Sequence, residues 1–143
     1  MIQKLTFASI AIVLACYNTS TPPITDIVGT WGGDNAGLIA SDTSAHVHIG
    51  CTLGDTKGPI HPDADGRFEV TGEYNVDAYP VDRGIFHPAR FSGEINGRTM
   101  TLTVVLTDTG RQLGPVTLTY GKEPKMGPCP ICRKPEKKLR TTN

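Results

Sequence analysis

The stretch ARFSGEINGRTMTLTVVLT, residues 89–107, decides the fold class. Apolar and polar residues alternate on both sides of Asn96-Gly97, which is the pattern of two half-buried strands joined by a tight turn. Asn-Gly is the dipeptide that two-residue hairpins favour, because both central residues of such a turn need a positive φ. The residues expected to face the core are Phe91, Gly93, Ile95, Met100, Leu102, Val104 and Leu106. The stretch therefore predicts an antiparallel hairpin with one buried face.

The same alternation continues through most of the chain between residues 26 and 121. The expected strands are 27–33, 37–41, 45–53, 57–62, 67–74, 89–95, 99–107 and 115–120. No segment shows helical periodicity longer than one turn, so we predict an all-β protein. A single small antiparallel up-and-down β-barrel of about eight strands is favoured, because closure removes exposed strand edges. A two-sheet β-sandwich is the alternative.

The residues expected to fill the interior decide whether such a barrel can hold a small ligand. They are Val47, Phe68, Tyr74, Phe91, Met100, Leu102, Leu118 and Tyr120. If these side chains occupy the interior, a partner is met through loops such as Asn75–Pro88. If they leave an open pocket, the barrel is expected to carry a small apolar ligand.

The N-terminus, MIQKLTFASIAIVLAC, predicts export. Its apolar run from Leu5 to Ala15 is too short to span a bilayer, which needs about 20 helical residues, and has the length of a signal peptide. The stretch Val13-Leu14-Ala15-Cys16 resembles a bacterial lipobox. That resemblance implies that Cys16 becomes the first residue of the mature protein and carries a diacylglycerol, since several acyl chains anchor stably. Ordinary secretion with cleavage near Ala15 is the alternative.

The rest of the chain divides into three parts by composition. Residues 16–25 are polar with two prolines and are expected to be a flexible tether. Residues 26–121 form the β-barrel domain, with six basic residues against twelve acidic ones. Residues 122–143 form a basic, proline-rich tail with seven basic residues against two acidic ones. This acidic body does not favour binding to nucleic acid.

Three cysteines remain once Cys16 is assigned to the anchor. A disulfide between Cys51 and Cys129 would fix the C-terminal segment across the barrel, and it is the pairing we favour. Cys129 and Cys132 also form a CPIC motif, so a redox centre or half of a zinc site stays open as an alternative. The role of Cys132 is not predicted.

Other chemical motifs are weak. His46 and His48 are two residues apart, a spacing that can bind a metal, but with Val47 in the core both should face solvent. They are weak metal candidates, and we expect no metal and no cofactor. Asp108-Thr109-Gly110 resembles the triplet of aspartic proteases, which need two copies, whereas this chain has one in an expected turn. We expect no catalytic residue, and hence no enzyme.

Two resemblances concern the whole domain. Gly29-Thr30-Trp31 at the start of an eight-strand meander resembles the calycin group, which includes lipocalins and avidins. The resemblance implies that Trp31 plugs one end of the barrel. Avidins have polar residues that bind biotin at the positions where this chain has Gly33 and Gly37, so biotin binding is not expected. The chain also looks like small bacterial lipoproteins that share a lipobox, a GxWGG opening, a mid-chain cysteine, a strand like MTLTVxLTDTG and a late cysteine.

Together these observations predict a lipoprotein of the bacterial cell envelope. It would be held through Cys16 to a membrane, which we expect to be the outer membrane. Its barrel would be a binding or inhibitory module for an envelope protein or a small apolar ligand. A purely structural envelope lipoprotein is the alternative, and a metal-binding protein is the least favoured reading.

Overall fold

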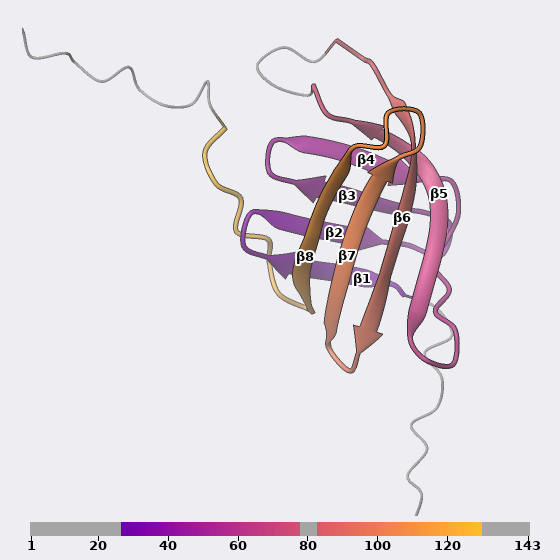
Figure 1. Ribbon diagram of the computed structural model, residues 1–143. Coiled ribbons are helices and arrows are strands. Elements are labelled where there is room, and N and C mark those ends of the chain that lie inside the picture. Colours follow the sequence, from indigo (N-terminus) through magenta and orange to yellow (C-terminus); the bar gives the residue numbers. More distant parts are fainter. Residues whose placement is uncertain (1–26, 78–82, 130–143) are drawn as a thin grey trace, which may run out of the picture.

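The computed structural model describes residues 27–77 and 83–129, and its regular structure in these ranges is entirely β. Eight antiparallel strands form a closed barrel in which each pairs with the next and β1 pairs with β8 (Figure 1). The strands are β1 (Gly29–Gly33), β2 (Ala36–Ala40), β3 (Ala45–Ile49), β4 (Thr52–Thr56), β5 (Arg67–Asn75), β6 (His87–Asn96), β7 (Thr99–Leu106) and β8 (Gln112–Tyr120). The predicted up-and-down barrel is confirmed. In the same ranges no helix is long and apolar enough to cross a membrane.

The hairpin that predicted the fold has the expected inward faces, but its two-residue turn is Gly97-Arg98 and not Asn96-Gly97. β6 and β7 pair from Asn96–Thr99 through Ala89–Leu106, with the turn at Gly97, whose φ is +57°. Met100, Leu102 and Val104 are fully buried, as the alternation required.

The middle of the sequence differs from the expectation. The single strand expected over 45–53 is instead a hairpin, in which β3 ends at Ile49 and β4 begins at Thr52. Gly50, with a φ of +60°, makes the turn possible, and Cys51 lies in this turn rather than on the inward face of a strand. The expected strand over 57–62 is not present. In that segment Ile60 is buried, and its carbonyl accepts a hydrogen bond from the amide of Ile27.

The barrel interior is a packed hydrophobic core. Seven of the eight residues expected inside are at most 5% exposed: Val47, Phe68, Tyr74, Phe91, Met100, Leu102 and Leu118. The expectation for Tyr120 was wrong, since its side chain is 41% exposed at the end of β8. There its ring meets Trp31 edge-on, with 5.1 Å between the ring centroids.

Trp31 occupies the interior at the β1–β8 closure. It is 4% exposed and pairs across the closure with Tyr120. Its indole N–H has no hydrogen-bond partner among the described residues, so the ring is held by packing alone. A buried, unpaired donor costs about 1–3 kcal/mol, which this packing has to offset.

Candidate functional site

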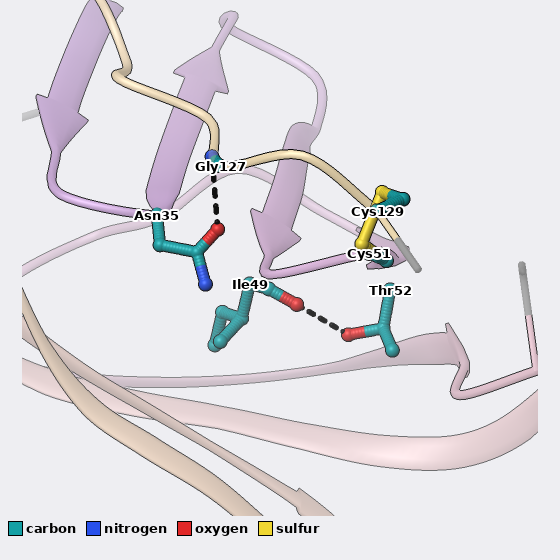
Figure 2. Close-up of a disulfide and its surroundings, with 6 residues drawn as sticks. All are labelled: Asn35, Ile49, Cys51, Thr52, Gly127 and Cys129. Carbon is teal, nitrogen blue, oxygen red and sulfur yellow. Dashed lines mark hydrogen bonds between the residues drawn. A yellow bond between two sulfur atoms is a disulfide. The ribbon is translucent and has the colours of Figure 1, made fainter. Parts of the chain in front are cut away.

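The chain after β8 turns back over the outside of the barrel. Residues 122–129, which we call the C-terminal strap, cross the β1–β2 end and finish beside the β3–β4 turn (Figure 1). The Lys125 amide donates to the Gly33 carbonyl at 3.0 Å, and the Lys125 carbonyl accepts from the Asn35 amide at 2.8 Å. The Gly127 amide donates to the side-chain oxygen of Asn35 at 3.2 Å (Figure 2). The strap is therefore bonded to the barrel on both sides of residue 126.

A disulfide holds the far end of the strap. Cys129 is joined to Cys51 in the β3–β4 turn, with 5.7 Å between their Cα atoms (Figure 2). This separation lies within the usual range for disulfides. It is the pairing that the sequence favoured, and it leaves the redox and zinc readings of the CPIC motif without Cys129. Cys132, like the lipidation candidate Cys16, lies outside the described residues.

Two glycines allow the strap to lie this close. Gly32 and Gly37 face each other across β1 and β2 on the outer face of the barrel. A Cβ atom at residue 37 would lie 2.7 Å from the Cβ of Pro124. A Cβ at residue 32 would lie 2.7 Å from the Glu123 carbonyl oxygen and nearer still to the Lys122 carbonyl. Ordinary carbon contacts are about 3.5–4.0 Å, so only glycine fits beneath the strap.

The histidine pair lies beside this crossing. His46 and His48 project from the outer face of β3, as the alternation predicted, and their Nε2 atoms are 2.8 Å apart. His46 pairs with Asp55 of β4, whose Oδ1 lies 2.6 Å from its Nδ1. When Nδ1–H of His46 donates to the carboxylate, its Nε2 is an acceptor and the Nε2–H of His48 donates to it. The three side chains form one hydrogen-bonded row.

Burial decides the protonation of the inner imidazole. The pKa of His48 is lowered, first by burial and then by the neighbouring His46, while Asp55 acts in the opposite direction. Both lowering effects disfavour a positive charge on His48. His48 is therefore neutral over a wider pH range than an exposed histidine.

A small hollow of about 120 Å³ separates the strap from the barrel surface. Its lining residues are Gly37, Leu38, Ile39, His46, His48, Pro124 and Met126. Except for the two imidazoles, the lining side chains are apolar. Among them, Ile39 and Met126 are exposed large hydrophobic residues, at 58% and 44%. The hollow thus combines two nitrogen donors and one thioether in an apolar setting.

A pair formed by a histidine and an aspartate lies at another part of the barrel. His87, at the start of β6, contacts Asp108 in the β7–β8 turn, with 2.7 Å between Nδ1 and Oδ2. The hydrogen bond from His87 lowers the pKa of Asp108. Gly110 follows with a φ of +75° and donates its amide to the Leu106 carbonyl. The Asp-Thr-Gly triplet therefore lies in a hairpin turn.

Among the described residues, the side chains that usually bind hard or borderline metal ions do not gather into a metal site. Within residues 27–77 and 83–129, no three His, Cys, Asp or Glu side chains come together in a way that could hold a metal ion. His61 and His87, the other two histidines of the chain, do not join His46 and His48 in such a group.

Sequence reasoning missed three residues of this site. Asp55 has no sequence signal, because unbroken alternation hides the turn at Gly50 and only that turn sets Asp55 opposite His46. Pro124 and Met126 were assigned to the tail. Their only sequence signal is Gly37, an outward-facing glycine in a strand, which indicates the close approach of another segment.

Comparisons with protein-family models, with curated proteins and with solved structures found no match.

Proposed function

We propose that the chain is a lipid-anchored lipoprotein of the bacterial cell envelope whose barrel is a non-catalytic binding or inhibitory module. The observation that carries the binding part is the packed interior. Because core side chains occupy the inside of the barrel, contact with a partner falls to the outer face and the loops. This favours an envelope protein over a small ligand carried inside.

The anchor rests on the sequence. The apolar run that ends at Ala15, the resemblance of residues 13–16 to a lipobox and the polar stretch that follows all support acylation of Cys16. The resemblance to small lipoproteins with a lipobox and a GxWGG opening supports the same assignment.

The loop between β5 and β6 is the surface we assign to the partner. Ile85 and Phe86 are 46% and 45% exposed there, directly before β6. Adjacent exposed apolar side chains are typical of protein contact sites. The neighbouring pair of His87 and Asp108 adds a polar rim.

Cys16→Ala tests the anchor. The wild-type chain should be processed in a globomycin-sensitive way and fractionate with membranes, whereas the variant should leave the membrane fraction. Cys132→Ala is the matched control, because it removes the other cysteine outside the disulfide and should stay on the membrane. Membrane fractionation of Cys16→Ala would contradict the anchor.

Photocrosslinking from the native envelope tests the binding module. A crosslinking residue in place of Phe86 should capture a discrete protein, and Ile85→Ala should weaken that capture. The same residue at Thr101, exposed on the outer face of β7, is the control. Equal products from both positions would favour the alternative of a purely structural lipoprotein.

A further inference from the structure

We infer that the hollow beneath the C-terminal strap is a copper(I) site. Its ligands are the Nε2 atoms of His46 and His48 and the thioether sulfur of Met126. These three side chains line one hollow, although Met126 comes from a segment far away in the sequence. The site is separate from the β5–β6 loop and goes beyond the proposed function.

The donor set selects the metal. Imidazole binds zinc and copper alike, but a thioether is a soft ligand that selects copper(I). Zinc prefers four ligands drawn from cysteine, histidine and carboxylate. No third residue of that kind joins the histidines in the described part of the chain. Two imidazoles and one thioether suit a soft ion of low coordination number.

The histidine row is arranged as a metal site requires. Asp55 accepts a hydrogen bond from Nδ1 of His46 at 2.6 Å, which leaves Nε2 of His46 unprotonated, with its lone pair directed at His48. A carboxylate behind a histidine is the usual outer partner of a metal-bound imidazole, because it fixes the tautomer and the orientation of the ring. When the metal takes the place of the hydrogen bond between the two rings, the proton on Nε2 of His48 moves to Nδ1 of the same ring.

The spacing of the two nitrogens is close to that of a chelate. Two metal–nitrogen bonds of about 2.0 Å that meet at about 90–120° separate their nitrogens by about 2.8–3.5 Å. The Nε2 atoms of His46 and His48 are 2.8 Å apart. Small rotations of two half-exposed rings are enough to admit the ion.

The strap prepares the third ligand. Met126 lies between Lys125 and Gly127, both of which are hydrogen-bonded to the barrel. The disulfide at Cys129 then closes the segment. The apolar residues Ile39 and Pro124 line the same hollow and supply part of the hydrophobic surroundings of the ion. In this interpretation the strap, which otherwise has only a structural effect, holds a thioether over two imidazoles.

The test is a copper(I) titration of the full chain under nitrogen, in competition with a copper(I)-specific chromophoric chelator. Free thiols are first blocked with N-ethylmaleimide, which leaves the disulfide intact. The wild-type protein should bind one equivalent. His46→Ala and His48→Ala should abolish this binding, and Met126→Leu should weaken it by more than about tenfold. Asp55→Asn should weaken it by about 10–100-fold, the usual effect of losing an outer partner.

His61→Ala and His87→Ala are the matched controls, since they remove the other two histidines of the chain and should bind as the wild type does. Circular dichroism and the melting temperature of each variant establish that the barrel is folded. X-ray absorption at the copper edge should show a sulfur neighbour that Met126→Leu lacks. Full binding by His46→Ala or His48→Ala, unchanged affinity in Met126→Leu, or displacement of copper(I) by equimolar zinc would each overturn the assignment.

Discussion

Gly37→Ala should displace the C-terminal strap without disturbing the barrel. The new Cβ atom would lie 2.7 Å from the Cβ of Pro124 and nearer still to its Cγ, which is about 1 Å or more inside an ordinary carbon contact. The strap must lift by about that much, which stretches the bond from the Lys125 amide to the Gly33 carbonyl, now 3.0 Å long. Overpacking of this kind costs about 1–3 kcal/mol. Urea unfolding should give a loss of about 2 kcal/mol.

A double-mutant cycle separates this clash from other effects of alanine. In a Pro124→Gly background the obstacle is gone, and alanine is favoured over glycine within a strand by about 0.5–1 kcal/mol. Gly37→Ala should therefore be neutral or stabilising in that background. Gly32→Ala is the contrasting variant, because its Cβ would meet the Glu123 carbonyl, which no side-chain change removes. An equal cost of Gly37→Ala in both backgrounds would refute the reasoning.

Three further predictions follow from the strap and from two titrating groups. Replacing Cys51 and Cys129 with alanine should lower the free energy of unfolding by about 4.5 kcal/mol on the chain-entropy account, for a sequence separation of 78 residues; a loss under about 1 kcal/mol would contradict it. His87→Ala should raise the pKa of Asp108 in carbon NMR titrations, because the hydrogen bond that lowers it is lost. The pKa of Asp108 is lower in the folded protein than in the unfolded chain. Its contribution to stability is therefore present above the unfolded pKa and is lost as pH falls through the folded pKa. The His87→Ala variant should lack this pH dependence of stability. Burial raises the pKa of Tyr74 above its ordinary value of 10.0, so ultraviolet absorbance should show its phenolate forming after that of exposed tyrosines. The contribution of Tyr74 to stability is complete below its ordinary pKa and is lost as pH rises through its folded pKa. Titration of Tyr74 together with the exposed tyrosines would count against its burial.

The fold was predictable wherever one face of a strand is buried. In β5, Arg67–Asn75, and in the β6–β7 hairpin, alternation fixes both the strand and its inward face. In each case the local pattern and the tertiary structure impose the same period of two. That agreement is why the barrel followed from sequence.

The same pattern failed at Gly50. Alternation runs through Ala45, Val47, Ile49 and Cys51 without a break, so a period of two does not reveal the turn. β4, in turn, has little apolar alternation, because its inward residues are Thr52, Gly54 and Thr56, with Gly54 beside the large ring of Tyr74. A count of eight strands was right, although the fourth strand lies at Thr52–Thr56 and not at 57–62.

The candidate site was less predictable because contacts distant in sequence build it. His46 and His48 could be assigned to the outer face from Val47 alone. Their partners depend on the turn at Gly50 and on a tail whose composition resembles that of a solvated end. No local pattern indicates that Met126 returns to the barrel.

The outer face of β1–β3 departs from the usual rule that such a face carries polar residues. Two cross-strand rows run over it: Gly32, Gly37 and His48 in one, and Ile39, His46 and Asp55 in the other. The first row consists of glycines where the strap crosses it. Each row then carries a histidine, and both histidines line the hollow that Met126 also lines. A barrel that needed only a fastened end could place glycines beneath the strap and any polar residues beyond them. Two hydrogen-bonded imidazoles beside the glycine row, backed by a carboxylate and lining one hollow with Met126, are more specific than fastening requires. Gly32 of the GTWGG opening therefore makes room for the strap together with Gly37, and through the strap serves the proposed site.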